Sequence, residues 1–180
     1  MKKTTLGIIV LTIALFSTFS FTIPDGWFVA GNKYKSYEIG TALAEGKDGK
    51  NCATIQSKEK KIRGFATLMQ TATASKFHGK RLKMSGYLKV QDVKKFAGFW
   101  LRLDSRGENN KYKMLGFDNM SNRKIKGNID WTKYEIVLDV PTETVSIAYG
   151  ALLAGTGKIW FDDITFEIVD ETVPTTNQMK

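Results

Sequence analysis

One segment of the sequence combines an aromatic ring, a guanidinium group and a carboxylate at alternating positions. Trp100, Arg102 and Asp104 occupy every second position of the segment 97–104. The positions between them are apolar, so the alternation predicts a strand whose core face carries Phe99, Leu101 and Leu103. A sugar ring stacks on an aromatic platform through its C–H groups, and its hydroxyls hydrogen-bond to planar polar groups. The exposed face of this strand therefore has the side chains that saccharide recognition requires.

The segment 113–119 is expected to form a hairpin with this strand. Its alternation assigns Leu115 and Phe117 to the core and Asp118 to the exposed face, with Gln70 adjoining from the segment 65–73. The candidate ligand-binding residues are thus Trp100, Arg102, Asp104, Asp118 and Gln70. The alternative is structural: an ion-pair ladder on an ordinary solvent face, with Trp100 packed under a loop.

Catalysis is not favoured by the residue inventory. The chain has one His, His78, and one Cys, Cys52, which excludes an intrachain disulfide, a Cys-rich zinc site and a multi-histidine metal centre. A glycosidase pair of Asp104 and Asp118 is disfavoured because both carboxylates would stay ionised next to an Arg. We therefore predict no enzymatic activity, no cofactor and no metal.

The N-terminus has the layout of a targeting segment. Lys2 and Lys3 precede an uncharged run from Thr4 to Ile23, whose middle is almost continuously apolar. The run is long enough to cross a bilayer, and its end is a poor match to a small-residue cleavage site. Residues 1–23 are thus expected to be either a cleaved signal peptide or an uncleaved N-terminal anchor helix. In both cases the following domain is exported, either secreted or attached to the outer face of the cytoplasmic membrane.

The rest of the chain is predicted to be one antiparallel β-sandwich over residues 24–169. Period-2 alternation dominates, turn residues separate about nine segments, and no stretch carries a convincing amphipathic helix. The residues expected in the core are Leu82, Met84, Leu88, Tyr134, Ile136, Leu138, Ile164 and Phe166. Alternation also assigns Trp160 to the same face as Ile164, and the polar tail 170–180 is expected to fray.

Three stretches resemble a known family. They are the segment 97–104, the block Phe117-Asp118-Asn119-Met120 with Gly127 and Asp130-Trp131 downstream, and the run from Ile147 to Ile164. Together they are similar to bacterial jelly-roll domains of the galactose-binding-like type, which are related in pattern to carbohydrate-binding modules. The resemblance covers about Trp27 to Val169 and implies a fold, but no particular ligand. Thr41 stands where related modules often place an acidic residue that helps to hold calcium, which argues against a calcium site. Some family members carry transcriptional-regulator labels, which nothing in this sequence supports.

The chain is basic, with a formal net charge of +9. Its cations cluster at Lys58–Arg63, at Lys94–Lys95 and between Lys76 and Lys83. Outside the membrane such a surface would meet anionic cell-wall polymers, phospholipid headgroups or acidic polysaccharides, unless the charge serves solubility alone. Nucleic acid is not expected, because the sequence has no recognition helix and no pattern of stacking aromatics.

Two hypotheses follow. The first is an exported, non-catalytic module that binds a carbohydrate or an anionic cell-wall polymer. The alternative is a structural or protein-interaction domain on the cell surface with no small ligand. The oligomeric state and the identity of the ligand are not encoded in any motif of the sequence.

Overall fold

The computed structural model describes residues 19, 20, 22–107, 109 and 111–179. Most of the described chain is strand, with two short 3-10 helices, and it contains no helix long and apolar enough to span a bilayer. The predicted signal or anchor helix of residues 1–23 lies mostly outside the described residues. The elements are β1 (Phe19–Ser20), β2 (Phe28–Ala30), η1 (Tyr34–Ser36), β3 (Tyr37–Ala42), β4 (Cys52–Ser57), β5 (Phe65–Thr73), η2 (Ser75–Phe77), β6 (Lys80–Arg106), β7 (Tyr112–Asp118), β8 (Ile125–Val140), β9 (Ser146–Ala154) and β10 (Lys158–Val169).

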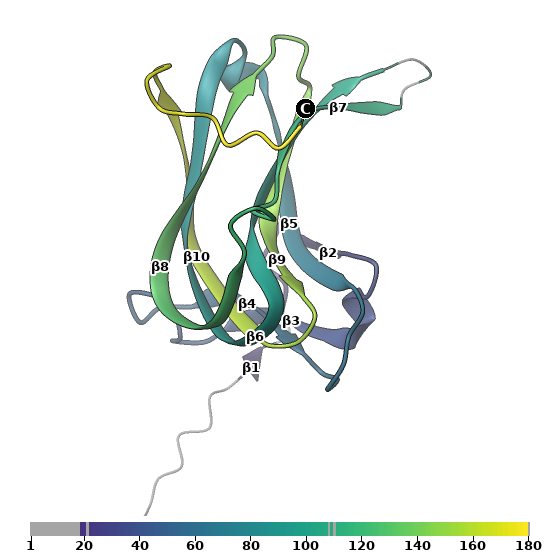
Figure 1. Cartoon of the computed structure of the whole chain (residues 1–180), viewed down its shortest axis with the longest axis vertical. Coiled ribbons are helices and arrows are strands. Elements are labelled where there is room, and N and C mark those ends of the chain that lie inside the picture. Colours follow the sequence, from purple (N-terminus) through teal and green to yellow (C-terminus); the bar gives the residue numbers. More distant parts are fainter. Residues whose placement is uncertain (1–18, 21, 108, 110, 180) are drawn as a thin grey trace, which may run out of the picture.

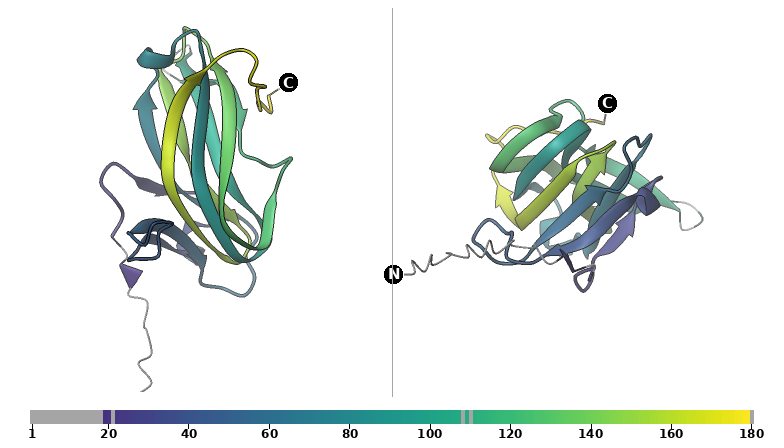
Figure 2. Two further views of the ribbon diagram at one scale, coloured as in Figure 1. Left: turned by 90° about the vertical axis from the view of Figure 1, so that its left-hand side faces the viewer. Right: turned by 90° about the horizontal axis from the view of Figure 1, so that it is seen from below.

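The strands form two antiparallel layers that share β6 (Figures 1 and 2). The first half of β6 pairs with β10 and β8, and β3, β4 and β1 extend this layer, which we call layer A. The second half of β6 pairs with β9 and β7, and β5 and β2 extend layer B. The alternation predicts a separate strand over residues 97–104, whereas the structure makes this segment part of one strand of 27 residues. The predicted jelly-roll sandwich is confirmed.

The main core lies between the two layers, on the faces that alternation indicates. Leu82, Met84, Leu88, Ile136 and Leu138 are each at most 1% exposed. Three other predicted core residues are half-buried and pack against this cluster: Tyr134, Ile164 and Phe166.

A bulge in β10 makes one predicted face wrong. The pairing of β10 with β6 shifts register between Asp162 and Thr165, and Asp163 has a positive φ of 52°. The extra residue reverses the alternation, so Trp160 lies on the outer face of layer A whereas Ile164 packs on the core. Asp162 accepts hydrogen bonds from the backbone N–H groups of Lys47 (3.2 Å) and Asp163 (2.9 Å).

The C-terminal tail is bonded to both layers, and the expectation that it would fray is wrong. The backbone N–H of Thr176 donates to the carbonyl of Val137 in β8 (2.8 Å), and that of Gln178 donates to the carbonyl of Phe117 in β7 (2.8 Å). The side chain of Asn177 accepts from the N–H of Phe117 (3.2 Å). Residues 174–179 therefore form a strap that joins the edges of the two layers.

Candidate functional site: a groove across layer B

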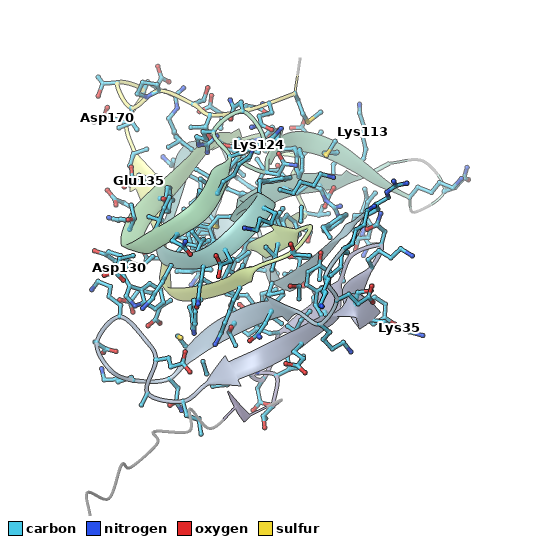
Figure 3. All side chains as sticks on the ribbon, turned by 60° about the horizontal axis from the view of Figure 1, so that its bottom comes forward. Lys35, Lys113, Lys124, Asp130, Glu135 and Asp170 are labelled. Atoms are coloured by element: carbon cyan, nitrogen blue, oxygen red, sulfur yellow. The ribbon has the colours of Figure 1, made fainter. Side chains whose placement is uncertain are left out.

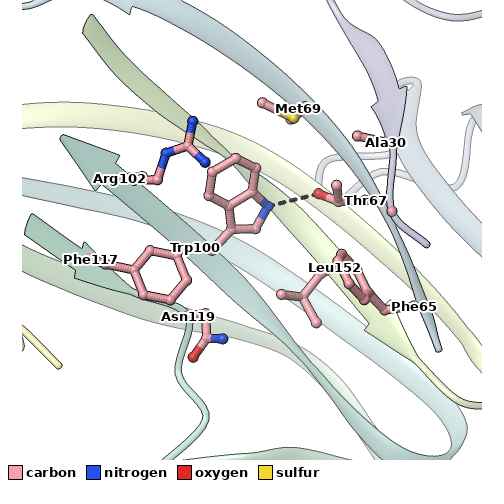
Figure 4. Close-up of a pocket in the computed structure, with 10 residues that line it drawn as sticks. Ala30, Phe65, Thr67, Met69, Trp100, Arg102, Phe117, Asn119 and Leu152 are labelled. Carbon is pink, nitrogen blue, oxygen red and sulfur yellow. Dashed lines mark hydrogen bonds between the residues drawn. The ribbon is translucent and has the colours of Figure 1, made fainter. Parts of the chain in front are cut away.

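The outer face of layer B is hollowed by a groove of about 270 Å³ (Figure 4). Each of the five strands of the layer contributes to it, through Ala30 (β2), Phe65, Thr67 and Met69 (β5), Leu152 (β9), Trp100 and Arg102 (β6) and Phe117 (β7), with Gly31 and Asn119 just beyond strand ends. The alternation of β6 places Trp100 and Arg102 here because Phe99 and Leu101 fill the core. Two of the predicted ligand-binding residues therefore line one hollow.

Trp100 is the floor of the groove rather than an exposed platform. It is 7% exposed and packs in an apolar cluster with Met69 and Leu152. Its indole N–H donates to the hydroxyl of Thr67 (2.7 Å), which in turn donates to the carbonyl of Ala151 (2.7 Å). The prediction that Trp100 lies on an exposed face is wrong, because layer B carries a second apolar cluster on its outer face.

Arg102 presents a guanidinium group to the groove beside the Trp100 ring (Figure 4). Its Nε donates to Oδ2 of Asp104 (2.8 Å), and the Asp104 side chain is 6% exposed whereas that of Arg102 is 41% exposed. Neither terminal nitrogen of Arg102 makes a hydrogen bond that the structure records among the described residues. Asp104 thus fixes the orientation of the guanidinium, and the end of the fork remains available for a ligand.

Asp118 does not belong to this surface, contrary to the prediction. It is fully buried and accepts hydrogen bonds from both terminal nitrogens of Arg123 (2.6 and 3.1 Å) and from the N–H of Met120 (2.7 Å). The pairing of β7 with β6 shifts register at Leu115, which is an extra residue between Met114 and Gly116. This bulge turns Phe117 to the groove and Asp118 to the core. Asp104 and Asp118 therefore cannot act as a pair on one ligand.

Gln70 also lies elsewhere. It faces the space between the layers, where it accepts a hydrogen bond from the hydroxyl of Tyr149. Together with Trp27 and Asp162 these residues line a pocket of about 460 Å³. The Trp27 and Tyr149 rings meet edge to face at 5.9 Å, and burial raises the pKa of Tyr149 above its ordinary value. The predicted set of five residues is thus divided between the groove, this pocket and the core.

The sequence reasoning missed Phe65, Phe117 and Asn119 as groove residues. Phe65 is 37% exposed at the start of β5, and it alternates with Thr67 and Met69. That alternation is visible in the sequence and could have identified Phe65. Phe117 could not have been found in this way, because the bulge at Leu115 reverses its face.

In the part of the chain that the structure describes, no three His, Cys, Asp or Glu side chains lie close enough together to hold a metal ion. The groove itself is lined by rings, apolar chains, one amide and one guanidinium. Such a lining can bind a ligand by stacking and hydrogen bonding.

Several solved structures have a fold similar to that of this chain. The CBM22-1 xylan-binding domain of Paenibacillus barcinonensis Xyn10C superimposes with a TM-score of 0.56 and 13% sequence identity, over 83% of this chain and 91% of that domain. The chain has the jelly-roll fold of carbohydrate-binding modules. The same fold occurs in the enzymatically active domain of bacteriophage CBA120 tailspike protein 4, with a TM-score of 0.60 and 10% identity, over 81% of this chain and 20% of that one.

A sequence relative of this jelly-roll module exists in Bacillus subtilis (strain 168). It is the uncharacterized HTH-type transcriptional regulator YbfP, 40% identical over 153 residues, which amount to 84% of this chain and 50% of that protein. The chain therefore spans about half the length of this curated relative. No family model matches the chain.

Proposed function

We propose that this chain is an exported, non-catalytic module that binds a carbohydrate or a polymer of the cell surface in the groove of layer B. The proposal rests on the groove of layer B, which side chains from five strands line. The terminal nitrogens of Arg102 face this groove while its Nε is bonded to Asp104. The fold supports it, because a xylan-binding domain has the same architecture. The ligand is expected to stack against Phe65 and Phe117 over the Trp100 floor.

In this proposal the hydrogen bonds from Arg102 fix the orientation of the ligand in the groove. A guanidinium fork can donate to two vicinal hydroxyls or to one carboxylate, so both neutral and acidic saccharides fit its chemistry. Asn119 adds a donor and an acceptor at the rim. The apolar floor takes the C–H face of the sugar ring, and burial of that face removes apolar surface from water.

Affinity gel electrophoresis tests the binding. The full chain is run through native gels that contain xylan or another soluble polysaccharide, and retardation relative to a ligand-free gel reports binding. Phe65→Ala is expected to abolish the retardation, whereas Ile168→Ala, which truncates an exposed apolar side chain on β10 of layer A, is expected to leave it intact. Equal mobilities of the two variants would refute the groove as the site.

The export of the module is part of the proposal. It is supported by Lys2 and Lys3 before the uncharged run that ends at Ile23. Cell fractionation is expected to recover the protein in the medium or on the outer face of the membrane. A cytoplasmic pool that retains Met1–Ile23 would contradict export.

The protein-interaction alternative remains the second candidate. It would be favoured by failure of every polysaccharide to retard the chain while Phe65→Ala still weakened the capture of an exported protein. No bond-breaking step is assigned to the module, and incubation with polysaccharide is expected to release no reducing ends.

A further inference from the structure

Four loops meet at one end of the sandwich and carry a concentration of exposed cations. Three of them connect strands, at residues 31–36, 58–64 and 155–157, and the fourth is the bend of β6 at residues 92–95, where Asp92 has a positive φ of 53°. Their exposed basic side chains are Lys33, Lys35, Lys58, Lys60, Lys61, Arg63, Lys94 and Lys95. We call this surface the basic end.

Backbone hydrogen bonds hold the four loops together. The N–H of Lys58 donates to the carbonyl of Ser36 (3.0 Å), that of Gly155 to the carbonyl of Gly64 (3.0 Å), and that of Lys94 to the carbonyl of Thr156 (3.0 Å). The buried hydroxyl of Tyr37 adds a bond to the carbonyl of Gly155 (2.7 Å). The cations are therefore fixed side by side on one rigid rim.

The charge of the basic end is not compensated locally. None of its cations makes an ion pair with a carboxylate among the described residues, and the loops contain only Glu59 and Asp92 as acids. Some cations elsewhere are paired, as Lys83 is with Glu167 (3.1 Å) and Arg81 with Asp139 (2.7 Å) on layer A. The basic end thus groups exposed positive charges that no neighbouring carboxylate neutralises.

The first strand that the structure describes, β1, lies at the bottom of the molecule, as the basic end does (Figure 1). It pairs with Thr41 and Ala42, at the end of β3 that is farther from Lys33 and Lys35. The turns at 92–95 and 155–157 lie at the bottom as well (Figure 1). Figure 3, with the bottom turned forward, shows Lys35 well apart from Lys113 and Asp170. β1 and the basic end thus lie at the same end of the long axis of the molecule.

We propose that the basic end lies against an anionic phospholipid surface. Cations on four neighbouring loops match a plane of many headgroups better than they match one small anion, because none of them is buried in a site. The proposal does not depend on whether the groove binds a saccharide.

Sedimentation with lipid vesicles tests this proposal. The full chain is mixed with vesicles of phosphatidylcholine alone or with 30 mol% phosphatidylglycerol, and the ratio of the two partition coefficients is measured. The apolar N-terminal run contributes to both coefficients, so the ratio isolates the charge. A triple variant, Lys60→Gln with Lys61→Gln and Arg63→Gln, is expected to lower the ratio at least tenfold, since each basic residue contributes about fivefold near such a surface.

A matched variant controls for net charge. Lys76→Gln with Lys80→Gln and Lys113→Gln removes the same charge from exposed positions outside the basic end and is expected to change the ratio less than threefold. Equal loss in both variants, or a wild-type ratio near one, would overturn the proposal. If the triple variant loses retention on heparin, an anionic polysaccharide, but keeps its vesicle ratio, the partner is a polymer and the lipid proposal is wrong.

Discussion

Each layer of the sandwich carries on its outer face a tryptophan that is almost fully buried, but the two faces differ in what surrounds the ring. Trp160 on layer A is 5% exposed, and its indole N–H donates to Glu45 in the loop after β3 (2.5 Å). The ammonium groups of Lys158 and Lys89 lie 4.2 and 5.5 Å from its ring centroid. Trp100 on layer B instead donates to Thr67 within its own layer. Because the bond of Trp100 requires no loop above the sheet, its face stays open as a groove.

This difference separates burial from function. Both tryptophans stabilise the fold, but only one lies under a hollow that a ligand can enter. The exposed fractions of Trp100 and Trp160 are nearly equal and do not distinguish the two faces. The faces differ in the residue that accepts the hydrogen bond from each indole N–H.

Truncation of the two tryptophans is the strongest test of this comparison. Trp100→Ala and Trp160→Ala are each expected to cost about 3–5 kcal/mol of unfolding free energy, because each leaves a cavity in an apolar cluster. Urea denaturation measures both costs. Polysaccharide binding is expected to be lost in Trp100→Ala alone, and a loss in Trp160→Ala under native conditions would show that the two faces do not differ in function.

The ion pairs of Asp118 in the core and Asp104 at the groove are expected to differ in their contribution to stability. Arg123→Gln is expected to cost about 3–5 kcal/mol, because it leaves the fully buried Asp118 carboxylate without its guanidinium partner. Arg102→Lys keeps a cation beside Asp104 and is expected to cost less than about 1 kcal/mol. Thermal unfolding of the two variants at neutral pH checks the order. A larger loss in Arg102→Lys would contradict the assigned roles.

The C-terminal strap connects stability to the groove. Deletion of residues 175–180 removes the hydrogen bonds to Val137 and Phe117, and a cost of about 1–3 kcal/mol is expected from bonds of this kind. Because Phe117 lines the groove, ligand affinity is expected to fall as well. Chemical denaturation and binding assays measure the two effects, and deletion of residues 179–180 alone serves as the control. Unchanged stability after the longer deletion would mean that the strap is not part of the folded unit.

Tyr37, whose hydroxyl bonds to a loop of the basic end, provides the smallest and most specific effect. Burial raises the pKa of Tyr37 from 10.0 to about 12, despite its hydrogen bond to Gly155. The unfolded chain therefore ionises first as pH rises, so the contribution of Tyr37 is complete below pH 10 and is lost as pH rises toward 12. Melting temperatures of the wild type are expected to fall more steeply across this range than those of Tyr37→Phe. Parallel curves would contradict the assignment.

The strands could be predicted from the sequence, whereas two of the faces could not. Leu82, Met84 and Leu88 alternate without interruption, so their burial follows directly from the pattern. Phe117 and Trp160 were assigned to the wrong side because a single extra residue, Leu115 in β7 and Asp163 in β10, reverses the alternation beyond it. The bulge in β7 adjoins Gly116, but that in β10 has no neighbouring glycine that would mark it.

The candidate site was predictable only in part for a related reason. Alternation in β6 places Trp100, Arg102 and Asp104 on one face, as the structure has them. The alternation does not indicate how deeply Trp100 is buried, because the side chains that pack against it, Met69 and Leu152, come from neighbouring strands. Strand order, which determines these neighbours, is not encoded in local periodicity.

The most direct measurement of the central proposal is a glycan-array comparison of the wild type with two Arg→Lys variants. Arg102 and Arg81 both pair with an aspartate through Nε, at 2.8 and 2.7 Å, but only Arg102 faces the groove. We expect the wild type and Arg81→Lys to bind the same glycans with equal affinity, and Arg102→Lys to bind them at least tenfold more weakly, because lysine cannot form the planar fork. Equal binding by the two variants, or no glycan bound by the wild type, would contradict the account.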